Sequence, residues 1–558
     1  MKKRIFLLFI IITFTFSGCV QKKDENKVVK KRNYPVIGLQ SPPKDLTSME
    51  NYNPRDEDLI CALFEGLVER DNNGEIKPAL AKDWKISDDG LTYVFNLNEN
   101  IFWSDGKEID AKNFVDFFRT ILNPNMGNKN AFELYSIFGA EDYNKGKKPQ
   151  GEMAIIATDK KTLQIRLNYV DEEFLQTLSK PRYRLRKNFE ALKSWKSNYK
   201  DIAYTGSYII SNMEEGKEKS SIILEKNTSY YNKDNILSDK IVLNDSGSSE
   251  VAMSRFDIGD IDIFFNPPIS EVERLKSSDN LDYITLQDFY ALIFNFKSPL
   301  SSKIDFRKAV NEALSASLDE SELIKKFNVS ISNGDIFKKD SNKAVFSTDS
   351  EKNEFKYDLF SANVKIKNIV NEEKDQYFKI LCLNDERSTL LMESLTEIME
   401  REFNIKSKIY YYNSSEIQDA LKKDFYDMAL IGYNSTGSKE VFFRRWYYST
   451  GKSINYSNEN IDKTLYKLKG EKEKGKRDQY INSVSTEIKN EIPMIPVFNE
   501  NLFICRNNTV DGIYMDGNEN IMINKLVKRE EISEDKKDIE KLDVPKDKID
   551  DMPIGYKK

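Results

Sequence analysis

Apolar and polar positions follow two different periods along the chain, and the two periods are mixed throughout. Residues 91–98 (LTYVFNLN) alternate after the turn residues SDDG, as a half-buried strand does. Residues 111–122 (AKNFVDFFRTIL) have apolar positions at helical spacing and stop at Asn123-Pro124. Further strands are predicted at 208–210, 221–225, 261–265, 292–296 and 378–383, and further helices at 58–69, 306–315, 388–403 and 477–489. This irregular alternation, without an internal repeat, predicts α/β lobes with several sheets.

The amino-terminal residues predict export and lipid attachment. Basic residues at 2–4 precede an uncharged run at 5–16, which is too short to span ~30 Å of hydrocarbon as a helix and is typical of a signal peptide. The run ends in FSGC, which resembles a bacterial lipobox, so Cys19 is the candidate lipidated residue and the first residue of the mature chain. An ordinary secretory signal with an incidental cysteine is the alternative. We expect a location on the extracytoplasmic face of the cell membrane, with membrane lipid as a partner through Cys19.

Composition removes several classes of function. The 558 residues are 39% hydrophobic, which is enough for more than one buried core. Lys plus Arg number 85 and Asp plus Glu 91, without a basic block, so we expect no nucleic-acid partner. The chain has no histidine, which excludes the usual Ser/His/Asp and Cys/His nucleophiles and histidine metal ligands. We therefore expect no enzyme, no catalytic residues, no metal site and no cofactor.

Three apparent motifs have plainer interpretations. Cys61, Cys382 and Cys505 lie far apart in apolar surroundings and are predicted to be buried, without a disulfide or a metal. The GEKEKGKR string at 470–477 has phosphate-loop spacing, but Arg477 stands where a Ser or Thr is required, and a charged, solvated turn is predicted instead.

The ERDNNGEI string at 69–76 resembles a calcium loop, but Leu80 occupies the place of the bidentate Glu. A tight turn is predicted there. Residues 529–558 are mostly charges of both signs and are predicted to form a disordered tail.

An ordered series of motifs between residues 63 and 118 is the most informative feature. F-E-G-L, G-x-I-x-P-x-L-A-x-x-W, S-D-D-G-L-T-Y-x-F and W-S-D-G occur there in this order. Later blocks include TGSYII at 205–210, YDMALIGY at 426–433 and EIPMIPVF at 491–498. From about residue 35 to 528 the chain closely resembles the family 5 extracellular solute-binding proteins, the oligopeptide-binding components of ABC importers.

The resemblance implies an α/β, two-lobed, periplasmic-binding-protein-like fold (type II, cluster C) with an inserted subdomain in the first lobe. The implied divisions are a signal peptide at 1–18, a lipid-anchored tether at 19–33, the first lobe at 34–75, 200–285 and 490–528, the insert at 76–199, the second lobe at 286–489 and the charged tail at 529–558. Hinge crossings follow near residues 285 and 490.

The resemblance also implies where a ligand binds. The candidate residues are Tyr52, Asn53, Pro54, Asn130, Gly432, Tyr433, Asn434, Ser435 and Thr436. The closest peptide binders have an Asp at the position of Thr436, where it neutralises the peptide's α-ammonium group. A hydroxyl group there cannot supply that charge. The amino end of a peptide is then left in solvent, blocked, or met by a different acid.

The function implied is capture of oligopeptides between the lobes by a monomer, with delivery to the membrane subunits of an ABC-type permease. The alternative is a diverged family member that acts as a peptide-signal receptor, a nonpeptide solute binder or a surface scaffold protein.

Overall fold

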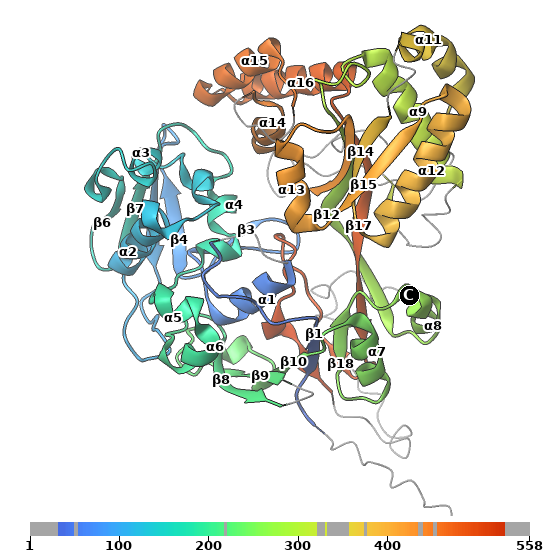
Figure 1. Cartoon of the computed structure of the whole chain (residues 1–558). Coiled ribbons are helices and arrows are strands. Elements are labelled where there is room, and N and C mark those ends of the chain that lie inside the picture. The colour runs from blue at the N-terminus through green and yellow to red at the C-terminus, as the bar shows by residue number, and fades with distance from the viewer. Residues whose placement is uncertain are drawn as a thin grey trace, which may run out of the picture.

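The computed structural model describes residues 32–49, 54–216, 220–320, 330–331, 356–372, 377–433, 439–449, 455–471 and 473–529. These residues form two lobes that are joined by a pair of long strands (Figure 1). We define the first lobe as the described residues up to 285 and from 501 onward, and the second lobe as those from 289 to 499. The remaining predicted divisions of the chain stay predictions.

One eleven-stranded sheet runs through both lobes. Its strands, in spatial order, are β15 (Ser407–Tyr412), β14 (Phe378–Leu383), β16 (Met428–Tyr433), β12 (Leu281–Phe294), β17 (Met494–Arg506), β11 (Ile263–Phe265), β1 (Val36–Leu39), β10 (Lys240–Asp245), β9 (Ser220–Lys226) and β8 (Tyr208–Glu215), with β13 (Ser330–Ile331) paired to β17.

The strands β12 and β17 connect the lobes. They pair antiparallel along most of their length, but the register shifts between Thr285 and Phe289 and again between Tyr290 and Ala291. Such bulges bend a strand and interrupt its ladder of hydrogen bonds. The pair is therefore least regular where it passes from one lobe to the other, which is where a hinge requires it to bend.

A second sheet belongs to the insert of the first lobe. Its order is β4 (Ala81–Ile86), β5 (Thr92–Leu97), β7 (Thr162–Arg166) and β6 (Ile155–Ala157). In β5 buried and half-buried residues alternate, as the sequence predicted. The helix α2 (Ala111–Ile121) packs an apolar face on this sheet and begins with a capping box between Asp110 and Asn113. Two small sheets pair β2 (Val68–Arg70) with β3 (Ile76–Pro78) and β18 (Val510–Asp511) with β19 (Val527–Lys528).

Helices cover the sheets of both lobes. The first lobe has α1 (Pro54–Leu63), α2, α3 (Ala140–Asn144), α4 (Phe174–Leu178), α5 (Phe189–Lys193), α6 (Trp195–Asn198), α7 (Ser249–Asp257) and α8 (Val272–Ser277). The second lobe has α9 (Ile304–Glu320), α11 (Leu359–Glu372), α12 (Glu386–Phe403), α13 (Ser414–Lys422), α14 (Lys439–Tyr447), α15 (Glu459–Gly470) and α16 (Lys474–Glu491). Short 3-10 helices include η2 (Ala131–Leu134) and η4 (Pro181–Tyr183).

The apolar cores follow the division into lobes. In the second lobe one core lies between the sheet and α9, α11 and α12, and another lies on the opposite face under α13 to α16. The β17 residues up to Phe498 belong to these cores, whereas Leu502 belongs to the large core that α1 and the insert share. Each lobe is therefore packed around its own apolar interior.

Several sequence predictions are confirmed. The strand at 378–383 coincides with β14, and the turn at 71–74 joins β2 to β3. Cys61, Cys382 and Cys505 are free and buried.

Two predictions are wrong. The helix predicted at 58–69 ends at Leu63, because the chain from Val68 pairs as a strand. The solvated turn predicted at 470–477 is also wrong, since α16 begins at Lys474 and Arg477 is only 4% exposed. Its guanidinium group donates to backbone carbonyl groups of Leu468 and Glu471, which makes burial of the charge tolerable.

The two ends of the described chain meet at one buried carboxylate. Asp262 is fully buried and pairs with Arg32 at 3.0 Å and with Lys528 at 2.6 Å. It also accepts a hydrogen bond from the backbone N–H of Val36, at the start of β1. No helix within the described ranges is both long and apolar enough to cross a bilayer.

Candidate functional site

The structure describes only part of the predicted site. Pro54 begins α1, Asn130 immediately precedes η2, and Gly432 and Tyr433 end β16. Tyr52 and Asn53, as well as Asn434, Ser435 and Thr436, lie outside the described residues, as does Cys19. The backbone N–H of Lys129 donates to the carbonyl oxygen of Met49 at 3.1 Å, so the segment before α1 and the segment before η2 lie side by side.

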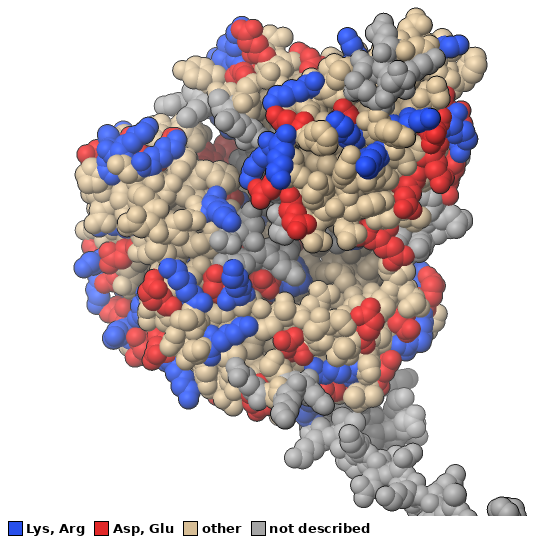
Figure 2. Space-filling model, in the orientation of Figure 1, with Lys and Arg blue, Asp and Glu red and all other residues tan. Residues whose placement is uncertain are grey.

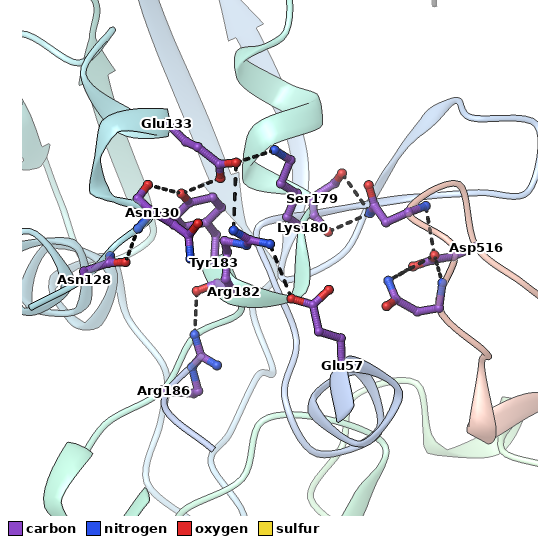
Figure 3. A network of polar contacts seen from close by, with 12 residues as sticks. Glu57, Asn128, Asn130, Glu133, Ser179, Lys180, Arg182, Tyr183, Arg186 and Asp516 are labelled. Atoms are coloured by element: carbon purple, nitrogen blue, oxygen red, sulfur yellow. Dashed lines mark hydrogen bonds and ion pairs between the residues drawn. The ribbon is translucent and has the colours of Figure 1, made fainter. Parts of the chain in front are cut away.

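A network of polar side chains forms the first-lobe wall, which we define as Glu57, Asn130, Glu133, Lys180, Arg182 and Tyr183 (Figure 3). The Tyr183 hydroxyl group donates to Glu133 Oε2 at 2.9 Å and to the Asn130 carbonyl oxygen at 3.2 Å. Lys180 pairs with Glu133 at 2.8 Å, and Arg182 lies between Glu133 and Glu57. The network joins α1, η2 and η4, which are far apart in the sequence.

The charges within this wall balance one another. Although burial opposes its ionisation, the positive charges of Lys180 and Arg182 lower the pKa of Glu133 to about 2. Glu133 is therefore a carboxylate at any physiological pH, and it is already matched by two cations. A ligand at this wall meets a fixed, neutralised set of donors and acceptors.

Asn130 has an unused donor. Its backbone N–H donates to Asn128 Oδ1 at 2.9 Å, which fixes the turn. Its side-chain nitrogen is buried and has no hydrogen-bond partner among the residues that the structure describes. A buried amide nitrogen without a hydrogen-bond partner costs free energy. A ligand or water molecule that accepts a hydrogen bond from the Asn130 side chain removes that cost.

The second-lobe wall, which we define as Tyr290, Arg387 and Gly432, begins directly after the bulge in β12 and rests on the buried Phe498. The ring of Tyr290 stacks on Phe498 with centroids 4.7 Å apart, and the Arg387 guanidinium group lies 5.6 Å from the Tyr290 centroid. Gly432 is exposed and opposite Tyr290 in the pairing of β16 with β12. A Cβ atom at Gly432 would lie 3.7 Å from the ring. Among the described residues, Gly432 therefore adds no side-chain atom beside the Tyr290 ring.

The surface is hollowed where the two lobes meet, and charges of both signs are interspersed around it (Figure 2). The two walls supply hydrogen-bond donors, paired charges and an aromatic face, which suit noncovalent binding. Within the described ranges, no group of three Cys, Asp or Glu side chains is placed to hold a metal ion.

Comparison with known families decides what kind of site this is. The family model for bacterial extracellular solute-binding proteins, family 5 (middle), matches residues 75–455. The chain belongs to this family. It is accordingly a solute-binding protein and not an enzyme, as the sequence predicted.

Relatives of this solute-binding protein match over most of its length. It is 25% identical to the dipeptide-binding protein DppE of Bacillus subtilis over 478 residues, which cover 81% of this chain and 84% of DppE. It is 22% identical to the oligopeptide-binding protein OppA of Bacillus subtilis over 549 residues, which cover 93% of this chain and 98% of OppA.

Solved structures of the same fold confirm the two-lobed architecture. The murein tripeptide binding protein MppA of Escherichia coli superposes with a TM-score of 0.72 at 19% identity, covering 89% of this chain and 99% of MppA. The pheromone receptor PrgZ gives a TM-score of 0.70 at 20% identity, covering 89% of this chain and all of the PrgZ chain. The sequence-based recognition of the family and of its fold is therefore confirmed.

Sequence reasoning missed most of the side chains that form the walls of this solute-binding protein. Arg182, Tyr183, Tyr290 and Arg387 were not predicted, because they come from segments that no motif connects. The only sequence signal is indirect. Tyr290 lies in a strand that enters the second lobe, three residues before the buried core residue Ile293, which belongs to the predicted strand at 292–296.

Proposed function

We propose that this chain is a lipid-anchored extracytoplasmic substrate-binding protein that captures oligopeptides between its lobes and delivers them to an ABC-type permease. The observation that carries the proposal is the similarity to the oligopeptide-binding protein OppA, which extends over 93% of this chain and 98% of OppA. A match over both whole chains indicates a shared architecture and not one shared subdomain. The hollow between the lobes supports the same function (Figure 2).

The walls favour a peptide of variable sequence. A peptide presents a carbonyl oxygen and an N–H at each residue, and these suit the Asn130 donor and the polar groups of the first-lobe wall. The half-buried ring of Tyr290, which lies beside the exposed Gly432, provides an aromatic surface for an apolar or aromatic side chain. Neither feature selects one particular amino acid.

Isothermal titration calorimetry with a peptide library of mixed lengths tests the proposal. Gly432→Trp places a large ring beside Tyr290, and we expect it to weaken peptide binding by about tenfold or more through lost space. Gly151→Trp is the matched control, because a side chain at Gly151 meets nothing within 4 Å. Peptide binding that is absent in the wild type, or equal in both variants, would refute the proposed site.

The recognition of the peptide's amino end is a separate part of the proposal. The first-lobe carboxylates Glu57 and Glu133 already face Lys180 and Arg182, so they offer no uncompensated negative charge to an ammonium group. We expect acetylation of the peptide's amino group to change the binding free energy by less than ~2 kcal/mol, the scale of a buried charge-assisted hydrogen bond. A larger loss would mean that an acid elsewhere captures the ammonium group.

Lipid attachment at Cys19 is the anchoring part of the proposal. Arg32, the first described residue, is fixed to the first lobe by its ion pair with Asp262. We expect Cys19→Ala to move the protein from the membrane fraction to the medium. Retention of the variant in the membrane, with cleavage elsewhere, would contradict lipid attachment at Cys19.

A further inference from the structure

The two lobes touch at a second place, away from the hinge strands. The loop before α4 in the insert approaches the amino-terminal ends of α14 and α16 in the second lobe, and Arg477 Nε lies 3.3 Å from Glu172 Oε1. Glu172 belongs to the first lobe, and its side chain is 58% exposed. The side chain of Arg477 is only 5% exposed. One partner is therefore fixed and the other is accessible.

Contacts within the second lobe hold the Arg477 guanidinium group in position. It donates to the carbonyl oxygens of Leu468 and Glu471 at 3.1 and 3.0 Å, and it pairs with Glu440. Glu440 in turn accepts hydrogen bonds from Arg444 at 2.7 and 2.8 Å. Because these contacts use the two terminal nitrogens of Arg477, the Nε edge is the part that faces the other lobe.

The charges that meet at this contact come from both lobes. Asp171 is the neighbour of Glu172, and burial, together with the negative charge of Glu440, raises the pKa of Asp171, whereas Arg477 opposes that rise. Arg477 therefore interacts with Asp171 and Glu172 of the first lobe and with Glu440 of its own lobe. Opening of the lobes would separate Arg477 from both first-lobe acids.

We propose that Arg477 and Glu172 form a latch that ties the insert of the first lobe to the second lobe and sets the ratio of closed to open molecules. The latch involves none of the residues in the two walls, so it acts on ligand affinity through closure and not through contact. When only the closed form holds the ligand fully, the apparent dissociation constant rises as the closed fraction falls. Arg477 and Glu172 are therefore positioning residues for the proposed capture.

Glu172→Lys is the sharpest variant, because it reverses the charge opposite Arg477 at an exposed position. Glu172→Gln removes the charge without reversal, and we expect it to lower the closed-to-open ratio by roughly two- to fivefold, the range of exposed ion pairs. Glu190→Lys is the matched control. It makes the same change in charge on an exposed insert residue whose partner, Lys193, lies in the same helix.

Pulsed dipolar spectroscopy of the full chain measures closure without any ligand. Spin labels at Lys147→Cys in the insert and Lys467→Cys in the second lobe are on exposed positions. In a Cys19→Ala background the other thiols, Cys61, Cys382 and Cys505, are buried and do not react. We expect Glu172→Lys to shift the distance distribution to longer values, Glu172→Gln to shift it less, and Glu190→Lys to leave it as in the wild type.

Equal distributions in the wild type and Glu172→Lys would overturn the latch, as would an equal shift in Glu190→Lys. A thermal melt of each variant accompanies the measurement, and an unchanged melting temperature for Glu172→Lys, as its exposure predicts, confirms that the shift reflects closure. The latch concerns closure alone, so its failure leaves peptide capture intact, and a failure to bind peptides leaves the distance measurement valid.

Discussion

The two lobes differ in how they bury charge. In the first lobe, buried arginines face buried acids, as Arg184 faces Glu65 and Arg55 pairs with Asp58. In the second lobe, the buried Arg307 donates to the backbone carbonyl oxygens of Ser301 and Glu491 and stacks on Phe296. In the second lobe the buried Arg477 also pairs with Glu440, beside apolar cores that cover both faces of the sheet.

The two lobes therefore differ in the interactions that hold their segments together. The network of the first lobe joins α1, the insert and the hairpin around residue 516 into one unit, because its partners come from all three. Because buried charges hold this unit together, its stability should depend on pH and should fall when a single charged side chain is removed. The second lobe has its sheet covered by apolar cores on both faces.

The largest expected effect comes from removing one arginine in each lobe. Arg184 donates to the carbonyl oxygens of Cys61 and Phe64 and opposes the charge of Glu65. We expect Arg184→Met to lower the free energy of unfolding by ~3 kcal/mol or more, because it leaves both carbonyl groups without their donor and removes the cation that faces the buried Glu65, which keeps only the Tyr230 hydroxyl group. Arg307→Met loses its carbonyl contacts and its stacking on Phe296 but leaves no acid that Arg307 had paired with, and we expect ~1–3 kcal/mol.

Urea denaturation followed by fluorescence compares the two arginine variants. Exposed Arg401→Met is the control, since its partners Glu320 and Glu402 are at the surface, and it should change stability little. A larger loss for Arg307→Met than for Arg184→Met would contradict the contrast between the lobes.

A second pair of variants replaces a glycine by alanine, which adds one methyl group, and compares the loss of stability at two positions. A Cβ atom at Gly206 would lie 2.6 Å from the backbone of Ala62, Leu63 and Phe64, so the strand β8 and the end of α1 must separate. We expect Gly206→Ala to cost ~1–3 kcal/mol in the free energy of unfolding. Gly432→Ala meets only the Tyr290 ring at ordinary contact distance and should be nearly neutral. Similar melting temperatures for the two variants would refute this close approach.

A separate expected effect is a pH dependence of the first lobe. Burial raises the pKa of Asp58 from 3.8 to about 7, against the opposing charge of Arg55. Because the folded state binds this proton more tightly than the unfolded state, the stabilisation is complete below pH ~4 and is lost as pH rises towards 7, by at most ~1.4 kcal/mol per pH unit. Asp58 accepts the N–H of Ile521, so the hairpin at 515–521 should report the loss.

Hydrogen exchange of that hairpin, corrected for intrinsic rates, measures this dependence. We expect less protection at about pH 8 than at about pH 5 in the wild type, and a smaller difference in Asp58→Asn, which keeps an acceptor for Ile521, since burial also raises the pKa of Asp516 in the same hairpin. An equal pH dependence in the wild type and the variant would exclude Asp58 as its source.

The sequence predicted the fold well where local pattern and family motifs agree. The capping residues and apolar face of α2 and the alternation of β5 are local properties, and the structure has both elements within a residue or two of the prediction. The helix at 58–69 was too long, because its apolar spacing continues into residues that pair as β2. Sheet pairing is a tertiary effect that no window of sequence contains.

The site was predictable only in part, for a related reason. With 32% charged residues, the composition does not show which charges are buried. Arg477 lies in a string of charges that reads as a solvated turn, yet α14, the end of α15 and the insert enclose it. Asn130 and Gly432 were predicted through the family resemblance and stay predictions, whereas Tyr183 and Tyr290 become neighbours of those residues only after folding.

The central claim is that this solute-binding protein captures oligopeptides. Mass spectrometry of the small molecules released when the protein, isolated from cells that export it, is denatured tests that claim most directly. The account predicts a set of peptides with varied sequences, and their marked depletion in Gly432→Trp but not in Gly151→Trp. Recovery of a single nonpeptide compound, retained by the wild type and absent from Gly432→Trp, would contradict it.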